Sequence, residues 1–268
     1  MAEPKSRAEV VELLAKLGRA GRLTGRDDLL LRTVQEVEAL TLGHARRLCW
    51  AEAAAVVAYQ RLTKLRGWGL LRSTPLPPDM AGWGLGPGPI YQLGPAGQLW
   101  LSPAATLDWQ GRRGNWLEPL LGAELLTRLV TDKSGLTWFG PAAAQSQWNL
   151  EPLVTGAAHW AGGSVIFHLA GLVRPTMNWA ELSRGFDRAV RGGRQNLPPV
   201  AILLRDGAMV NLVSELLVQR RRGPVTYLLA IWADLAGASN LWAAPLWRQL
   251  PPESEPVGRQ SLAGLASR

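Results

Sequence analysis

Apolar residues recur at steps of three and four through the first third of the chain, a spacing that predicts a run of amphipathic helices. Val10, Leu14 and Leu17 mark a leader helix that ends at Gly18. Three further helices are predicted at about 27–38, 42–48 and 51–66. Gly67 closes the last of them, so the helical region ends there.

The pattern changes after Gly67. Short apolar stretches at 69–72 and 90–93 predict two strands on either side of a Pro- and Gly-rich loop at 75–89. Helices followed by such a hairpin are typical of a winged helix-turn-helix, in which the short helix braces the next one against the phosphate backbone and the hairpin reaches an adjacent groove. We therefore expect a winged helix-turn-helix domain with its leader helix at residues 1–102.

The second half of the chain alternates between strand-like and helix-like patterns. Residues 103–152 are irregular apart from an amphipathic helix at 118–130, and we interpret them as a connector. Beyond them, strands are predicted at 165–169, 200–204 and 225–230, and helices at 179–190 and 209–219. This alternation predicts a small α/β domain at 153–250 with a mainly parallel sheet, followed by a flexible tail at 251–268. The fold class is α+β overall.

Composition places the chain among globular proteins. Of its 268 residues, 47% are hydrophobic and 19% are charged. No window approaches 18 uninterrupted apolar residues, and the start of the chain lacks a basic segment followed by an apolar one. We therefore expect a cytoplasmic protein with no membrane partner. The single cysteine, Cys49, excludes an intramolecular disulfide.

The charge balance favours a polyanionic partner. A formal net charge of +8 and a pI near 10.5 suit double-stranded DNA, because basic side chains release condensed counterions from phosphates. The excess of Arg over Lys, with abundant Trp, Pro and Gly, is equally consistent with a GC-rich coding bias. Charge alone therefore indicates the class of partner without establishing it.

Three segments of the predicted winged helix carry recognisable motifs. The first opens on Arg26-Asp-Asp and continues as Leu-Leu-Leu-Arg-Thr-Val. The second is Leu62-Thr-Lys-Leu-Arg-Gly-Trp-Gly-Leu-Leu-Arg, and the third is Ile90-Tyr-Gln-Leu-Gly-Pro-Ala-Gly. Together they resemble the winged-helix half of the replication-relaxation family, whose members are encoded on plasmids, integrative elements and phages. The resemblance implies a part in the replication or mobilisation of mobile DNA.

The second half is similar to the restriction-endonuclease-like domain of the same family. That resemblance implies active-site carboxylates where this sequence has His159 and then Phe167 to Gly171. A cleavage site needs clustered oxygen ligands that hold a metal ion beside the phosphate. We therefore expect a catalytically inert domain with no metal and no cofactor.

Candidate DNA contacts lie on the helix at 51–66 and on basic clusters elsewhere. Tyr59 and Gln60 are candidates for base contact, with Thr63 beside them, and Arg61 and Lys64 for phosphate contact. The outward positions of this helix are otherwise Ala and Val, which predicts low sequence specificity. The basic candidates elsewhere are Arg46, Arg47, Arg72, Arg184, Arg188, Arg191, Arg220, Arg221 and Arg222. Arg194 continues the basic helix face of Arg184, Arg188 and Arg191, which is the best polyanion candidate of the second domain. Arg112 and Arg113, a basic pair between tryptophans, are weaker candidates.

These patterns leave three hypotheses. The first is a non-enzymatic DNA-binding accessory protein of a mobile element, as a monomer or a homodimer. The second is an adaptor that docks other proteins of a DNA-processing or defence complex. The third is a divergent metal-dependent nuclease, since Asp206 follows the strand at 200–204, where acids act in parallel-sheet enzymes.

Overall fold

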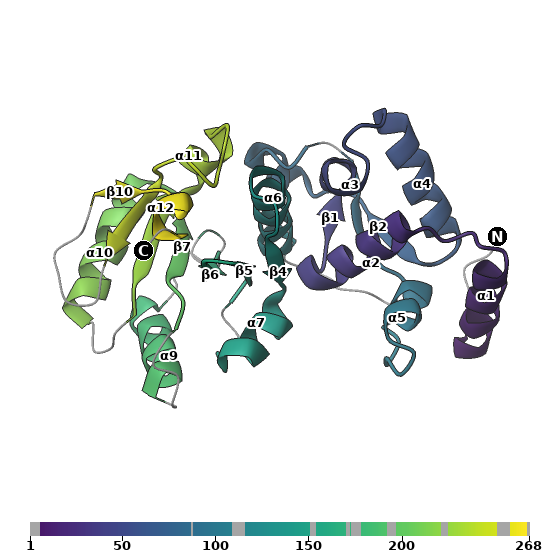
Figure 1. Cartoon of the computed structure of the whole chain (residues 1–268), viewed down its shortest axis with the longest axis horizontal. Coiled ribbons are helices and arrows are strands. Elements are labelled where there is room, and N and C mark those ends of the chain that lie inside the picture. Colours follow the sequence, from purple (N-terminus) through teal and green to yellow (C-terminus); the bar gives the residue numbers. More distant parts are fainter. Residues whose placement is uncertain are drawn as a thin grey trace. The chain divides into compact units, whose positions relative to one another are not determined.

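A computed structural model describes residues 6–86, 88–108, 116–150, 154–169, 172, 178–191, 197–220, 225–250 and 258–266. The chain divides into two compact units, Met1–Thr127 and Arg128–Arg268 (Figure 1). Each unit has its own sheet. Within the described residues, no helix combines the length and the apolar character needed to cross a membrane.

Side-chain caps set the starts of the first helices of unit 1. Helix α1 (Arg7–Arg19) begins after Ser6, whose hydroxyl accepts from the Glu9 amide. Helix α2 (Gly25–Val37) begins with a capping box between Thr24 and Asp27. Strand β1 (Leu40–Thr41) leads into α3 (Leu42–Cys49), where a second capping box pairs Thr41 with His44. The helices predicted at about 27–38 and 42–48 are confirmed.

Helix α4 (Ala55–Gly67) follows a turn at 51–54, so it begins four residues later than predicted. Strand β2 (Leu71–Thr74), the 3-10 helix η1 (Pro78–Trp83) and strand β3 (Ile90–Leu93) come next. The hairpin strand predicted at 90–93 is confirmed, and the one predicted at 69–72 lies two residues later, at 71–74. Strand β3 pairs antiparallel with both β2 and β1. Helices α5 (Pro95–Leu101) and α6 (Leu117–Asp132) complete this part of the chain.

The core of unit 1 lies between the helices and the β1-β3-β2 sheet. Leu30, Leu62, Leu65 and Ile90 are fully buried there. Helix α5 packs directly on backbone, because a Cβ atom added at Gly97 would lie 2.2 Å from the carbonyl oxygen of Leu70. Only glycine permits this approach at that position.

Unit 2 is built on a seven-stranded sheet in the order β10-β9-β8-β7-β6-β5-β4. Its strands are β4 (Thr137–Phe139), β5 (Gly156–Trp160), β6 (Gly163–His168), β7 (Val200–Leu204), β8 (Tyr227–Ile231), β9 (Trp247–Leu250) and β10 (Arg259–Gln260). Its helices are α7 (Pro141–Trp148), α9 (Trp179–Arg191), α10 (Gly207–Arg220), α11 (Trp232–Gly237) and α12 (Leu262–Ala266). The three predicted strands and two predicted helices of this region are confirmed by β6, β7, β8, α9 and α10.

The prediction of a mainly parallel sheet is wrong. Among the strands that the structure describes, only the central pairs β6–β7 and β7–β8 are parallel, and the neighbouring pairs on both sides of them are antiparallel. The sequence pattern detected the centre because buried parallel strands are continuous apolar runs. Strands such as β9, with Arg248 and Gln249 between apolar residues, lack that signature.

The predicted connector and tail also contribute to the structure. Residues 103–152 include α6, β4 and α7, and β4 pairs with β5 at the edge of the large sheet. The division between the units falls inside α6, after Thr127. In the segment predicted as a flexible tail, residues 258–266 form β10 and α12, and β10 pairs with β9.

Candidate nucleic-acid interface

Helix α4 buries one face and exposes the other. Ala58, Leu62 and Leu65 are fully buried. On the outward side, Gln60, Thr63 and Lys64 are exposed, and the side chains of Val56, Val57 and Tyr59 are 55%, 45% and 51% exposed. With 3.6 residues per turn, Val56, Gln60 and Thr63 share the side of the helix opposite Leu62. The outward surface is therefore apolar at its N-terminal end and polar beyond it.

An ion pair holds α4 against the start of α2. Arg61 Nε donates to Asp27 Oδ1 at 2.7 Å, and its Nη2 donates to Asp27 Oδ2 and to the carbonyl oxygen of Arg22. The guanidinium also lies 5.3 Å from the centre of the Trp68 ring. Arg61, predicted as a phosphate contact, is thus engaged within the fold and positions α4.

The protonation of this pair follows from its surroundings. Burial alone would raise the pKa of the Asp27 carboxyl, but hydrogen bonds from Arg61 and Thr24 outweigh burial and lower it. The hydrogen bond to Asp27 raises the pKa of the Arg61 guanidinium. Both groups are therefore charged at neutral pH, and the partly exposed Arg61 satisfies the buried carboxylate of Asp27.

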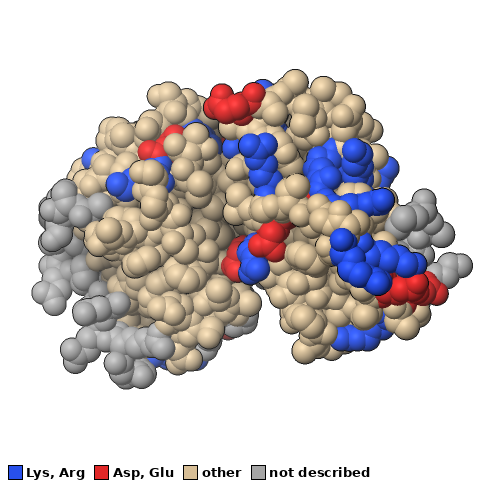
Figure 2. Space-filling view, turned by 45° about the vertical axis from the view of Figure 1, so that its right-hand side comes forward, with Lys and Arg blue, Asp and Glu red and all other residues tan. Residues whose placement is uncertain are grey.

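A hollow of about 620 Å³ lies between the first turn of α2 and the outward side of α4. Its α2 side includes Thr24 and Arg26, and its α4 side includes Val57, Gln60 and Lys64. Arg26 and Lys64 are exposed cations. Figure 2 shows Lys and Arg side chains grouped on the surface of unit 1, on the right, with fewer acidic ones. The hollow can accept an anion such as a phosphate group.

The sequence analysis did not include Arg26 among the candidate DNA contacts. The signal that could have found it is the capping box at Thr24 and Asp27, which starts α2 at Gly25 and places Arg26 in its first turn. The Asp27–Arg61 pair then brings that turn beside α4. This second fact requires the tertiary structure.

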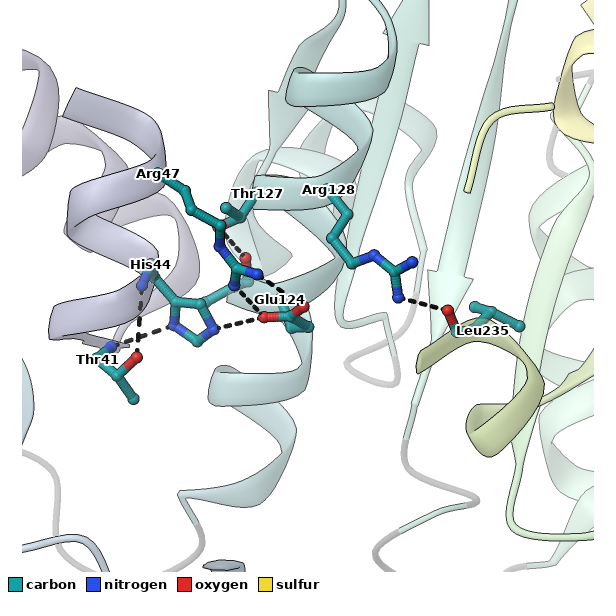
Figure 3. A network of polar contacts seen from close by, with 8 residues as sticks. Thr41, His44, Arg47, Glu124, Thr127, Arg128 and Leu235 are labelled. Carbon is teal, nitrogen blue, oxygen red and sulfur yellow. Dashed lines mark hydrogen bonds and ion pairs between the residues drawn. The ribbon is translucent and has the colours of Figure 1, made fainter. Parts of the chain in front are cut away.

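Of the two arginines predicted on α3, Arg47 is engaged within the fold and Arg46 is exposed. Arg47 donates to both carboxylate oxygens of Glu124 on α6 (Figure 3). His44 Nε2 lies 3.0 Å from Glu124 Oε2, and the Thr41 amide donates to His44 Nδ1 at 3.1 Å. Because Nδ1 is an acceptor, Nε2 carries the proton of a neutral imidazole and donates it to Glu124.

The network sets the charge of both titratable groups. Burial lowers the pKa of His44 more than its hydrogen bond to Glu124 raises it, so the imidazole is neutral at pH 7. Burial alone would raise the pKa of Glu124, but the hydrogen bonds from His44 and Arg47 lower it to about 2. Arg47 therefore faces an ionised carboxylate and ties α3 to α6.

The hairpin offers little positive charge. Arg72, predicted as a backbone contact, donates from Nε to the carbonyl oxygen of Leu93 at 3.2 Å and from Nη2 to that of Asp108. No Lys or Arg stands between Arg72 and Arg112 in the sequence. A proline-lined hollow that includes Pro75 and Pro89 lies at the base of the loop. The loop itself therefore has no cation with which to neutralise a phosphate.

The basic residues predicted in unit 2 are only partly described. Arg184 and Arg188 are exposed on α9, and Arg184 Nε donates to the carbonyl oxygen of Ala180 at 3.3 Å. The side chains of Arg191 and Arg220, at the ends of α9 and α10, fall outside the described residues, as do Arg221 and Arg222. Arg194 and the weaker candidates Arg112 and Arg113 also lie outside them.

The residues considered for metal-dependent cleavage occupy separate places in unit 2. Asp206 Oδ1 accepts from the Met209 amide at 2.9 Å, which is a capping role at the start of α10. His159 is exposed on β5, with Nδ1 at 2.8 Å from the Ser164 hydroxyl, and His168 is buried on β6. Among the described residues, no three His, Cys, Asp or Glu side chains gather into a set that could hold a metal ion.

Comparison of the chain with protein-family models, with curated proteins and with solved structures finds no match.

Proposed function

We propose that this protein binds duplex DNA through the outward surface of α4, without itself catalysing a reaction. The observation that carries the proposal is the arrangement of Gln60, Thr63 and Lys64 on one exposed helix surface beside Arg26. Gln and Lys side chains reach base edges and phosphates, and Thr hydroxyls contact either. The helix that presents them is held in place by the Arg61–Asp27 ion pair, so little order is lost on binding.

The order of elements supports a winged helix-turn-helix in unit 1. A short helix, α3, precedes α4, and two antiparallel strands follow it. Strand β1, before α3, joins the same sheet in the order β1-β3-β2. In such a module the helix in the place of α4 enters the major groove. The resemblance of three segments to the replication-relaxation family supports an accessory role in the replication or mobilisation of mobile DNA.

The charge distribution predicts salt-sensitive, largely sequence-neutral binding. Arg26, Lys64 and Arg46 are exposed cations of unit 1 that can each neutralise one phosphate. Because each neutralised phosphate lowers the slope of log K against log salt by about 0.9, three contacts predict a slope of about −3. The hairpin loop adds no cation, so the slope is much less steep than that of proteins with many phosphate contacts.

Fluorescence anisotropy with a labelled duplex of mixed sequence, between about 50 and 200 mM salt, tests this proposal. The double variant Arg26→Gln, Lys64→Gln is expected to bind more weakly. Its slope should lie closer to zero by about 2, because one phosphate contact is lost for each cation removed. Lys16→Gln, an exposed lysine of α1 that pairs with Glu12, is the matched control for charge and is expected to keep the slope. Binding that is absent, or that does not change with salt, would contradict the proposal.

A second candidate function is protein docking, which the exposed Val56, Val57 and Tyr59 favour. Large apolar side chains grouped on one helix turn are characteristic of protein interfaces. In that case Val56→Ser would weaken capture of a partner from nuclease-treated extract, whereas the Arg26→Gln, Lys64→Gln variant would leave DNA affinity unchanged. The salt titration above distinguishes the two functions, because only DNA binding predicts a slope that becomes less steep when the two cations are removed.

A further inference from the structure

The first two turns of α4 carry an unusual surface for a helix that enters a DNA groove. From Ala55 to Tyr59 the sequence is Ala-Val-Val-Ala-Tyr, with no Arg, Lys or Asn. The valines are about half exposed, although valine side chains are more often buried. The nearest arginine, Arg61, is engaged with Asp27. Apart from the Tyr59 hydroxyl, this end of the helix therefore lacks a side chain that could donate to guanine.

Apolar side chains recognise one feature of the major groove. The C5 methyl group of thymine is the only apolar group that a base pair presents there, whereas guanine presents the acceptors O6 and N7. In the same A·T pair, adenine offers N7 and N6, which an amide side chain such as Gln contacts through two hydrogen bonds. Val56 and Gln60, one helical turn apart, thus match the two edges of A·T pairs.

The spacing of these residues suits neighbouring base pairs. Four residues along an α-helix cover about 6 Å, and base pairs are stacked about 3.4 Å apart. Val56 and Gln60 can therefore meet pairs within about two steps of each other. In winged-helix and related modules, the N-terminal residues of this helix are those that reach the base edges.

We propose that α4 recognises A·T pairs through the methyl groups of thymine, with Val56 and Val57 as the contacting side chains and Gln60 as the adenine contact. This inference rests on the proposed function, since it requires α4 to enter the major groove. It gives the otherwise sequence-neutral binding a modest base preference. Burying one methyl group corresponds to a change in affinity of about fourfold.

Four duplexes of matched length test the inference by anisotropy at constant salt. The first pair contains an A·T-rich centre with thymine or with deoxyuridine, which removes the methyl groups and leaves every hydrogen-bonding group in place. The second pair contains a G·C centre with cytosine or with 5-methylcytosine, which adds a methyl group at the same position of the groove. The wild-type protein is expected to favour the methylated member of each pair by about fourfold for each methyl group contacted.

Variants assign the effect to the two valines. Val56→Ala, Val57→Ala removes their γ-methyl groups and raises the helix propensity, so the helix is kept and both methyl-dependent ratios are expected to fall to about one. Val11→Ala, an equivalent truncation of an exposed valine on α1, is the matched control and is expected to keep both ratios. Far-UV circular dichroism and thermal melting verify that each variant is folded.

Two outcomes overturn the inference and are distinct from failure of the proposed function. If the wild-type protein binds all four duplexes with salt-dependent but equal affinity, α4 does not read methyl groups, although DNA binding stands. If the ratios persist in the double variant, other residues read the methyl groups. If none of the four duplexes binds, the proposed function itself fails.

Discussion

The substitution Glu124→Gln tests the polar network that joins α3 to α6. In the wild-type protein, the carboxylate accepts from His44 Nε2 at 3.0 Å and from both terminal nitrogens of Arg47. These hydrogen bonds lower the pKa of Glu124, against the effect of burial, from 4.5 to about 2. Gln has the shape of the protonated carboxyl group, so the substitution mimics protonation without changing the pH.

The structure sets the size of the effect. A fall in pKa from 4.5 to about 2 corresponds to roughly 3.4 kcal/mol, at about 1.4 kcal/mol for each tenfold change in proton affinity. The Arg47 side chain is 45% exposed, and solvent screens its attraction to the carboxylate. We therefore expect Glu124→Gln to lower the free energy of unfolding by about 2 kcal/mol at pH 7.

The pH dependence follows from the direction of the change in pKa. Because the folded-state pKa lies below the unfolded one, the stabilisation by Glu124 is fully present above about pH 4.5 and is lost as the pH falls toward 2. The difference between the wild type and Glu124→Gln is therefore expected to shrink over that interval. His44, whose pKa is also lowered in the folded state, reduces the stability of both proteins as the pH falls below about 6.5.

Urea unfolding followed by far-UV circular dichroism at pH 7, 4.5 and 3 measures these differences, and hydrogen exchange on peptides from α3 locates them. Glu215→Gln, an exposed position on α10, is the matched control and is expected to change the stability by less than about 0.5 kcal/mol. An equal stability of wild type and Glu124→Gln at pH 7 would refute the reasoning. A difference that persists unchanged at pH 3 would refute it as well.

Two further substitutions probe unit 1. Gly97→Ala is expected to destabilise the protein by about 2–3 kcal/mol in thermal melting, since the added Cβ would overlap the carbonyl of Leu70. Gly18→Ala in α1 is the control, because a Cβ atom added there has no neighbouring atom within 4 Å, and it should be neutral or stabilising. Asp27→Asn is expected to lower the free energy of unfolding by about 3 kcal/mol in urea at pH 7, because it leaves Arg61 without an anionic partner. Since hydrogen bonds lower the pKa of Asp27 against burial, this loss of stability should diminish below about pH 3.8. A loss that stays constant down to pH 2 would contradict this account.

The site illustrates why charged residues are harder to assign from sequence than apolar ones. In the sequence, nothing separates Lys64 from the arginines Arg47, Arg61 and Arg72, since each is a cation in a basic region. In the structure, the three arginines donate to carboxylates or carbonyls of unit 1, and Lys64 lies exposed beside the hollow. An arginine has five donors on a long side chain, and its partners come from distant segments that no local pattern identifies.

The sequence by itself determined helices α1 to α4 and α6, the hairpin strands and the central strands of unit 2, because hydrophobic periodicity, capping residues and glycines act over a few neighbouring residues. It did not indicate α5, which begins at Pro95 between Gly94 and Gly97. Strand direction at the edges of the large sheet depends on which segments meet in space, so only the tertiary structure decided that β4, β5, β9 and β10 make it a mixed sheet. The same holds for the α4 surface. Its exposed valines follow from helical spacing, but the partners of Arg61 and the approach of Arg26 depend on the first turn of α2 lying beside α4, which brings together residues more than thirty positions apart.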